Sequence, residues 1–543
     1  MRKIKLNGIN TLSHCSSYID NKKIWLLILI LLWTWLVATC IYVATNKYVD
    51  VWLQPKWHAF ICSLVVVSLI LSFFVFLEID ILWKKIYKYI CLSTNILIIV
   101  EALLYLISKA SLLSGLIPIS LTIGHFDNVT GFSSCLSVSF PLGILLFRSL
   151  NNFQKAVIIM SKVGILAVVV SCESRTGVIC IISSVLFTLF YYGKIRKVTM
   201  AFVFSSFIVI CATLFKTPSS QGRLFILSRT IEMIKKRPIS GWGHNGFCKN
   251  YMDIQANYFS LHPESRYRLL ADNIHHPLNE YLLVAVNYGI PMLAICLLFI
   301  IITACHYFRH TNRYSSEGFM VLLTITTYAF FSYPFSYPFT WLMLCLSLLV
   351  VFASSVRKGM FRNIALVAFL LSDLIIAHAV FPFTKSFHNQ LDWKKASLHS
   401  CSRKSIDKYD TLYTQMKSDY HFLYDYACVA YDLGQYEKAL LLANEAALFV
   451  SDYNLTLLLA DIYNVLSEKD KALSYYDYAH DMCPSRIAPY YETYKIYSVR
   501  NDTLNCFRLF KEVNSLHIKV NNFLTEAMLS EIKKDFQRFI INH

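Results

Sequence analysis

Long apolar runs alternate with short polar segments over roughly the first 380 residues. About eleven of these runs are near the ~20 residues that a helix needs to cross a bilayer. The longest polar interval among them is rich in Arg, His, Asn and Gly. The pattern predicts an all-α, polytopic transmembrane bundle with one large loop, 216–280. The expected spans are 24–45, 58–77, 88–109, 132–149, 155–171, 177–193, 198–215, 281–304, 318–335, 338–355 and 362–381.

Lys and Arg gather before the first expected span and in every second loop after it. By the positive-inside rule these basic loops face the cytoplasm. The alternate loops, including the large loop and everything after about residue 382, are then expected on the outer side of the membrane. The regular alternation favours an odd number of spans.

The composition changes beyond residue 382, where the chain becomes polar with roughly balanced charge. The segments GQYEKAL at 434–440 and SEKDKAL at 467–473 are similar and lie about 33 residues apart, which fits helix-turn-helix repeats of the tetratricopeptide kind. A third, more degenerate copy is expected from 488 to 502. We therefore divide the chain into a transmembrane domain, 1–381, and a helical-repeat domain, 382–543. Such repeats usually bind partners or act as rigid spacers.

Composition agrees with a membrane protein. The chain has 543 residues, is 56% hydrophobic and has 16% charged residues, against ~25% in ordinary soluble proteins. The formal net charge of +17 belongs to the basic loops, and no basic, aromatic-interleaved motif indicates nucleic-acid binding. Several of the 16 Cys lie inside apolar runs, where they behave as small hydrophobes. No Cys/His spacing indicates a metal site.

A very short turn between two apolar runs carries Glu173, Ser174 and Arg175. Ionisable residues at a membrane edge are costly and tend to face cavities. A guanidinium beside hydroxyls suits bidentate contact with phosphate. The alternative is that Arg175 reaches lipid headgroups.

The large loop carries further cations and two adjacent histidines. Arg223 and Arg229 lie in an expected amphipathic helix, 222–236, which the turn beginning at Arg237 ends. His275, His276, Asn279 and Glu280 come just before the next span. His276 and Asn279 are expected to share one face if this is the first turn of a helix. Asn279 as a simple cap, and either histidine as a surface residue, are the alternatives.

Four pieces of the sequence follow one another along the chain: FDNVTGF at 126–132, SRTG at 174–177, GR at 222–223 followed by RPISGWGHNGF at 237–247, and HPLNEYLLVAVNYGIP at 276–291. This ordered set resembles the O-antigen ligase and polymerase superfamily of bacterial envelope glycosyltransferases. Two departures fall in the last of these pieces: Leu278 is found where the family often has His, and Asn287 where it has an acidic residue. Val129 replaces a proline of the family's pattern.

The resemblance implies an inverting glycosyl transfer from undecaprenyl pyrophosphate to an acceptor hydroxyl, without nucleotide sugar, metal or other cofactor. The pyrophosphate would be held by Arg175 and Arg223, with Arg229 or Arg237 as supports. His276 is the best candidate base, because imidazole titrates near ~6.5, and Glu280 is the runner-up. Asn279 would orient either one. His276 is favoured over His275.

The resemblance also implies a multi-pass protein of the bacterial inner membrane, with the large loop and repeat domain periplasmic. The acceptor stays open among lipid A core (a ligase), another lipid-linked repeat unit (a polymerase) and a protein hydroxyl (an oligosaccharyltransferase). The repeats lean slightly toward ligation or a protein acceptor and are a candidate site for a protein partner. A transporter of lipid-linked saccharide is an alternative, which predicts charged residues at mid-membrane and internal repeats. A scaffold anchored by its spans is a further alternative.

Overall fold

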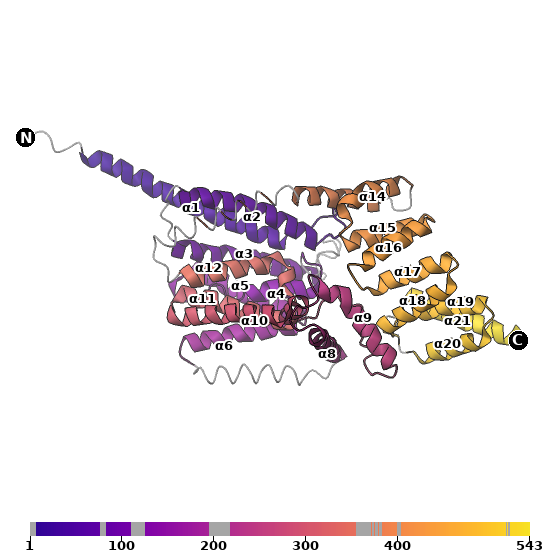
Figure 1. Ribbon diagram of the computed structural model, residues 1–543. Coiled ribbons are helices and arrows are strands. Elements are labelled where there is room, and N and C mark those ends of the chain that lie inside the picture. The colour runs from indigo at the N-terminus through magenta and orange to yellow at the C-terminus, as the bar shows by residue number, and fades with distance from the viewer. Residues whose placement is uncertain are drawn as a thin grey trace, which may run out of the picture. The chain divides into compact units, whose positions relative to one another are not determined.

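The computed structural model describes residues 7–76, 83–109, 125–194, 218–353, 383–398, 403–516 and 522–542, with a few single positions besides. Within these ranges the protein is all-helical (Figure 1).

The chain divides into two compact units. The first combines Met1–Phe207 with Leu298–Phe387, and the second combines Ile208–Leu297 with His388–His543. The large loop therefore groups with the C-terminal helices, although the sequence places it between apolar segments.

The first unit holds most of the apolar helices. Its elements are α1 (Asn7–Ile41), α2 (Leu53–Phe76), α3 (Trp83–Lys109), α4 (Val129–Ser139), η2 (Phe147–Ser149), α5 (Asn152–Ser171), α6 (Arg175–Tyr191), the second part of α10 (Glu280–Arg309), α11 (Arg313–Phe331), η3 (Pro334–Ser336) and α12 (Pro338–Ala353).

Five described helices are long and apolar enough to cross a bilayer, namely α1, α2, α3, α5 and α10. α6 and α12 are apolar but shorter. The expected spans 198–215 and 362–381 lie outside the described residues, apart from single positions in the second. The expected span 132–149 is not one helix, because α4 ends at Ser139 and turns lead on to η2. About eleven spans thus remains a prediction for the whole chain.

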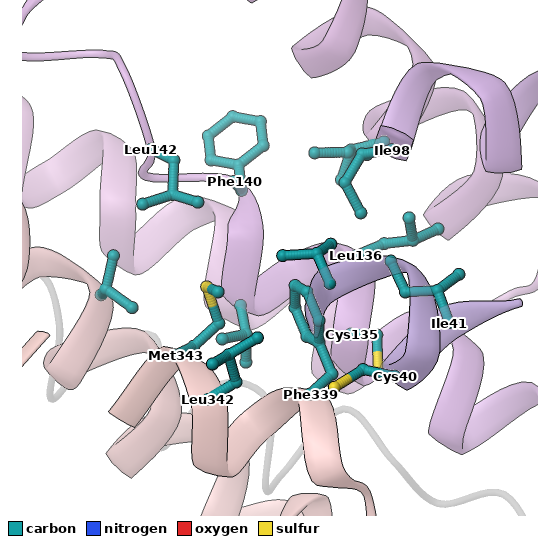
Figure 2. Close-up of a cluster of buried hydrophobic side chains, with 14 of the residues drawn as sticks. Cys40, Ile41, Ile98, Cys135, Leu136, Phe140, Leu142, Phe339, Leu342 and Met343 are labelled. Atoms are coloured by element: carbon teal, nitrogen blue, oxygen red, sulfur yellow. The ribbon is translucent and has the colours of Figure 1, made fainter. Parts of the chain in front are cut away.

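Side chains from distant helices form the core of the first unit (Figure 2). Cys40 of α1 and Phe339 of α12 are 0% exposed, and Cys135 of α4 is 1% exposed. These cysteines are unpaired and pack as small hydrophobes, as their apolar surroundings predict. The same cluster includes Ile98 of α3 and Met343 of α12, so these five side chains alone join four helices.

A buried carboxylate satisfies the backbone where α4 stops. Glu317 of α11 is fully buried, and its oxygens accept hydrogen bonds from the backbone N–H groups of Gly143 at 2.7 Å, Leu145 at 3.2 Å and Leu146 at 3.3 Å. Unpaired backbone N–H groups inside an apolar bundle cost several kcal/mol each, about as much as the hydrogen bond they lack. The turn after α4 therefore depends on Glu317.

The second unit combines two helices of the large loop with the C-terminal helices. Its elements are α8 (Pro218–Lys236), α9 (Gly246–Leu261), the first part of α10, α14 (Arg403–Met416), α15 (Tyr420–Asp432), α16 (Tyr436–Ala447), α17 (Tyr453–Val465), α18 (Lys469–Met482), α19 (Ala488–Val499), α20 (Thr503–Ser515) and α21 (Phe523–Asn542).

The helices α15 to α18 form two successive helical hairpins, visible side by side in Figure 1. α15 begins at Tyr420 and α17 at Tyr453, an offset of 33 residues. α16 and α18 begin at Tyr436 and Lys469, which gives the same offset. The period seen in the sequence is thus a period of helices, while its assignment to the tetratricopeptide kind stays a prediction.

The turn of each hairpin is closed by one residue in the left-handed region. Gly434, Ser467 and Asn501 have φ values of 75°, 66° and 55°. After each of them, the next N–H bonds to the carbonyl five residues earlier, at 2.9 to 3.0 Å. This is the Schellman ending, which satisfies the last carbonyls of a helix and favours glycine. Asn501 closes the turn between α19 and α20, so these two helices form a third hairpin with the same ending.

Ser467→Gly should stabilise the protein by about 1 kcal/mol, because a residue with a Cβ pays roughly that amount in the left-handed region. Asn501→Gly should gain less, since Asn tolerates this conformation better. Thermal unfolding of the purified full-length protein measures both. A fall in Tm for Ser467→Gly would show that the left-handed turn is not the source of strain.

Candidate functional site

The turn between α5 and α6 presents Arg175 at a helix start. Glu173 has a φ of 52° and closes α5, and its neighbour Ser174 caps α6 by accepting a hydrogen bond from Gly177 N at 3.2 Å. Arg175 is the first residue of α6 and is exposed. The positive end of the helix and the guanidinium thus lie together, an arrangement that favours anions.

The Arg175 turn is tied to the helix that follows the FDN segment. Ser174 Oγ donates to Ser133 Oγ of α4 at 2.8 Å, and Ser133 Oγ lies 3.0 Å from the Tyr328 hydroxyl of α11. Ser133 and Tyr328 are both fully buried or nearly so. A chain of buried hydroxyls therefore fixes the cap on which Arg175 depends.

The FDNVTGF segment forms the start of α4. Asn128 is its N-cap, with Oδ1 accepting from Gly131 N at 2.7 Å. Val129 is the first helical residue, a position where proline fits well because its N–H has no partner within the helix. The replacement of the family's proline by Val129 therefore keeps the helix start. Asp127 accepts a hydrogen bond from the Tyr337 hydroxyl at 2.9 Å, so this segment is also held by η3 and α12.

A buried pair beside this segment was missed by sequence reasoning. Glu101 of α3 is 0% exposed and accepts hydrogen bonds from His125 N and His125 Nδ1, both at about 3.0 Å. The signal in the sequence was a lone acidic residue inside the apolar run LIIVEALLY. Such a residue needs a partner in the bundle, and the partner is His125, next to Phe126.

The loop arginines differ in what surrounds them. Arg223 of α8 is exposed. Arg229 bonds to Glu232 Oε2 at 2.6 Å and lies 4.3 Å from the Tyr258 ring. Arg237 lies 4.5 Å from the Trp242 ring. Arg229 is therefore already engaged by an acid and an aromatic face, whereas Arg237 is stacked but exposed.

The RPISGWG segment pairs with the backbone of a broken helix. Trp242 N donates to Val286 O at 2.8 Å, Gly243 N to Asn287 O at 2.9 Å, and Ile290 N to Pro238 O at 2.7 Å. α10 is interrupted at this point by Gly289, whose φ is 82°. The loop therefore takes up the carbonyl and N–H groups that the break frees.

Asn287 fills the place where the resemblance expects an acidic residue. Its side chain is 8% exposed, and its Oδ1 accepts a hydrogen bond from Phe247 N at 3.0 Å, near the start of α9. The amide thus joins α9 to α10 through a neutral acceptor. In this protein, Asn287 therefore helps to hold the large loop against α10.

His276, Asn279 and Glu280 come together at the start of α10. Asn279 accepts from Leu282 N at 2.9 Å, so it is the cap of the helix, and His276 precedes the helix. The expectation that His276 and Asn279 share a helical face is therefore not met, because the helix begins at Glu280. His276 Nε2 instead lies 3.7 Å from Glu280 Oε2.

The backbone between them is strained in a way that sets the histidine tautomer. Leu278 has a φ of 55°, unusual for a side chain of its size. In that conformation Leu278 N donates to His276 Nδ1 at 2.9 Å. Because an N–H can only donate, Nδ1 carries the lone pair, and the proton of the neutral ring is on Nε2. His276 thus presents an N–H toward Glu280.

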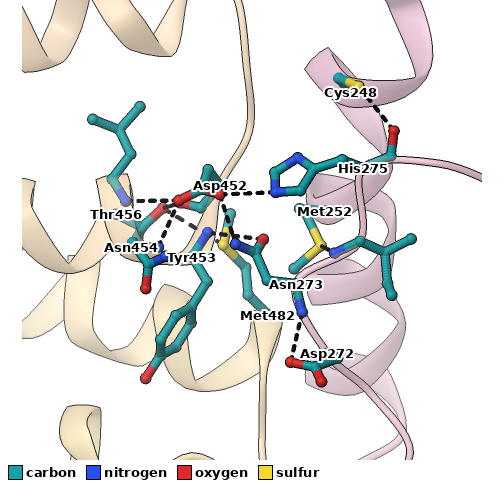
Figure 3. Close-up of polar contacts among 12 residues, drawn as sticks. Cys248, Met252, Asp272, Asn273, His275, Asp452, Tyr453, Asn454, Thr456 and Met482 are labelled. Atoms are coloured by element: carbon teal, nitrogen blue, oxygen red, sulfur yellow. Dashed lines mark hydrogen bonds and ion pairs between the residues drawn. The ribbon is translucent and has the colours of Figure 1, made fainter. Parts of the chain in front are cut away.

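His275 turns the other way, toward the C-terminal helices. Its Nε2 lies 3.2 Å from Asp452 Oδ2, and its carbonyl accepts a contact from Cys248 Sγ at 3.0 Å (Figure 3). The hydrogen bond to Asp452 raises the pKa of His275 to about 9. Burial raises the pKa of Asp452, but hydrogen bonds from His275 and Asn273 outweigh it, so this pKa lies below its usual range. The two adjacent histidines therefore have different partners.

The second unit brings together the loop cations and the His276–Glu280 pair, while Arg175 belongs to the first unit. Within the described ranges, no group of three or more His, Cys, Asp or Glu side chains is placed to hold a metal ion.

These features define an all-helical, multi-pass membrane protein with a cation-bearing loop anchored at one apolar helix. Residues 159–297 match the family model described as O-antigen ligase. The matched range runs from α5 into α10 and holds every candidate residue from Arg175 to Glu280. It supports the O-antigen ligase superfamily and, with it, a membrane glycosyltransferase or ligase. The comparison with curated proteins finds no match.

Gly289→Ala should lower the stability of the protein by at least about 2 kcal/mol, because a left-handed φ and a steric clash add up there. An added Cβ would lie 2.0 Å from Ile239 O. Gly222→Ala, in α8 with its nearest neighbour atom 3.8 Å from the added Cβ, is the matched control and should be neutral or stabilising. Thermal unfolding of the two variants compares them. Equal Tm values would contradict the pairing of loop and helix break.

Proposed function

We propose that the protein transfers a glycan from undecaprenyl pyrophosphate to an acceptor hydroxyl at the outer face of the bacterial inner membrane. The observation that carries this proposal is the position of Glu280 at the start of the candidate span α10, with His276 just before it, inside the segment that matches the O-antigen ligase model. A lipid-borne substrate must meet its catalytic groups at such a boundary.

The reaction needs charge stabilisation at the leaving group. The acceptor oxygen forms a bond to the anomeric carbon, the bond from that carbon to the pyrophosphate oxygen breaks, and the acceptor proton passes to a base. Fixed cations stabilise the negative charge that grows on the pyrophosphate. Arg175, at a helix start, and Arg223, exposed on α8, are the groups best suited to this role. Arg237 and Arg229 are supports, Arg229 the weaker because Glu232 already engages it.

The geometry changes which of the two candidate bases, His276 or Glu280, is preferred. His276 accepts from Leu278 N through Nδ1, so its other nitrogen carries a proton and points at Glu280. A protonated nitrogen cannot take up the acceptor proton, so this arrangement favours Glu280 as the proton acceptor, with His276 Nε2 beside it at 3.7 Å. Asn279 contributes by capping α10, which holds Glu280 in place.

The acceptor class remains a choice among lipid A core, a second lipid-linked unit and a protein hydroxyl. We favour ligation, to lipid A core or to a protein. The C-terminal hairpins lie in one unit with the large loop, so an acceptor or a protein partner bound by the repeats would share that unit with the catalytic pair.

A transporter of lipid-linked saccharide is the second candidate, and buried charges favour it. Glu101 and Glu317 are buried in the first unit, and Lys162 is half-buried there. Each of them bonds to neighbouring protein groups: Glu101 to His125, Glu317 to backbone N–H groups, and Lys162 Nζ to Asn95 Oδ1 at 2.7 Å. These bonds suit structural roles, and we therefore place the transporter second.

A deletion strain complemented with variants tests the proposal through its envelope glycans. Arg175→Ala, Arg223→Ala and Glu280→Gln should each lower transfer on the order of a hundredfold, since each removes a charge that acts in the transition state. His276→Ala should do likewise. Intact long chains should accumulate on the lipid carrier, and each variant must be present at wild-type level.

Arg266→Ala is the matched control, because Arg266 is an exposed loop arginine bonded to Tyr267. It should rescue fully. Carriers and acceptors bearing single repeat units only would identify a polymerase. Full rescue by all four site variants would reject the catalytic assignment and move the transporter ahead.

A further inference from the structure

The stretch just before His276 is bonded to the C-terminal helices residue by residue. Asn273 Nδ2 donates to Asp452 Oδ2 at 2.6 Å, and His275 Nε2 lies 3.2 Å from the same oxygen (Figure 3). In return, Tyr453 N donates to Asn273 Oδ1 at 3.3 Å. The contacts run in both directions, so neither chain segment can shift without breaking bonds on the other.

A second carboxylate, that of Asp272, directly precedes Asn273 in the chain. Asp272 Oδ1 accepts from Arg486 at 2.7 Å, and Asp272 Oδ2 from Lys519 at 2.9 Å. Gln255 of α9 joins both sides, since its Nε2 donates to Asp272 O at 3.0 Å and to Met482 O at 2.7 Å. The loop is thus held by three separate elements of the C-terminal part.

Asp452 is itself rigidly placed. As the N-cap of α17 it accepts from Asn454 N at 2.7 Å and Leu455 N at 3.0 Å through Oδ1. This leaves Oδ2 for the loop. A carboxylate fixed by its own helix is a good anchor, because holding it costs little additional side-chain entropy.

The bonds to the loop are not a general property of the repeated helices. Asp419 takes the same position one period earlier, as the N-cap of α15, where it accepts from His421 N at 3.0 Å. Among the described residues, no hydrogen bond or ion pair joins Asp419 to the large loop. The two aspartates share one structural task, and Asp452 has a further one.

We propose that Asp452 is a positioning residue: through Asn273 and His275 it fixes the backbone that carries His276 and Glu280, so that the C-terminal repeats hold the transfer site in its working geometry. This inference rests on the proposed function. The repeat helices would then contribute to turnover, in addition to binding any partner. His275 would tether the loop to these helices, whereas His276 belongs to the site.

Asp452→Asn is the direct test. Asn caps a helix as well as Asp does, and its single oxygen is then used by the cap. The NH₂ group that faces the loop cannot accept a hydrogen bond from the protonated His275 ring. With purified full-length protein and a polyprenyl-pyrophosphate-linked glycan, kcat should fall roughly tenfold to a hundredfold, as small misplacements of catalytic groups do. KM for the donor should stay within about twofold, since the loop arginines are untouched. Asp419→Asn should match wild type in both.

A conservative substitution of His275 tests whether a hydrogen-bond donor alone is enough to keep turnover. His275→Gln keeps an N–H donor for Asp452 and should retain most of the turnover, whereas His275→Ala should behave like Asp452→Asn. Loss of turnover in His275→Gln equal to that in His275→Ala would overturn the tether. So would unchanged kcat in Asp452→Asn, or equal losses in Asp452→Asn and Asp419→Asn.

The His275–Asp452 ion pair should also make the stability of the protein depend on pH. The folded pKa of His275, about 9, exceeds its ordinary ~6.5, so the stabilisation is complete below pH ~6.5 and is lost as the pH rises through about 9. The Tm difference between wild type and Asp452→Asn should therefore shrink between pH 6.5 and 9.5, and a constant difference would contradict the ion pair. The neighbouring titratable groups are Cys248, Tyr420 and Tyr424, and burial raises the pKa of both tyrosines above this window. The series is repeated in Cys248→Ser to remove the thiol.

Hydrogen exchange separates this inference from the proposed function. In Asp452→Asn the backbone amides from 272 to 283 should exchange roughly tenfold faster than in wild type or Asp419→Asn, because the segment opens locally more often. This readout needs no activity. Unchanged exchange would overturn the positioning role, whereas absence of any transfer by the wild-type protein would reject the proposed function alone.

Discussion

The backbone pairing between the RPISGWG segment and the break in α10 is the constraint on which the rest of the large loop depends. A helix long enough to cross a bilayer is interrupted at Gly289, and its freed groups must find partners nearby. Three hydrogen bonds from residues 238–243 supply them. The loop is therefore attached to α10 at two places, at the start of the helix and at its break. This attachment also fixes the position of the loop's cations relative to α10.

The start of α10 carries the two candidate bases and the residue that caps the helix. Asn279 caps α10, Glu280 opens it, and His276 is folded back toward Glu280 by the left-handed Leu278. Within the first unit, the buried hydroxyls of Ser133 and Tyr328 fix the cap before Arg175. In each case a helix start is held by a short polar network, so that a charged side chain is positioned by rigid structure.

Much of the architecture could be predicted from the chain, because hydropathy and period are local properties. The candidate spans α1, α2, α3, α5 and α10 follow expected apolar runs, and the 33-residue offset of the hairpins follows the repeated motif. The sequence also proposes the candidate site residues, since charged and polar groups stand out beside apolar runs. The count of spans in the whole chain and the roles of the site residues stay predictions.

What could not be predicted depends on unusual backbone or on distant partners. Leucine is a poor guide to a left-handed φ, so the return of His276 to Glu280 had no signal. Asp452 and Asn273 are 179 residues apart, and nothing local marks their contact. Glu101 was visible as a lone acid, but its partner His125 lies in a separate segment. Tertiary contacts of this kind decide which of several similar polar residues takes part in a site.

The most direct measurement follows a labelled polyprenyl-pyrophosphate glycan in liposomes that contain the purified protein and an acceptor. The account predicts that the bond between sugar and pyrophosphate is cleaved, with one polyprenyl pyrophosphate appearing for each glycan transferred to the acceptor, and with no nucleotide sugar required. Movement of the intact lipid-linked glycan across the bilayer, without cleavage in the presence of any of the three acceptor classes, would contradict it and identify a transporter.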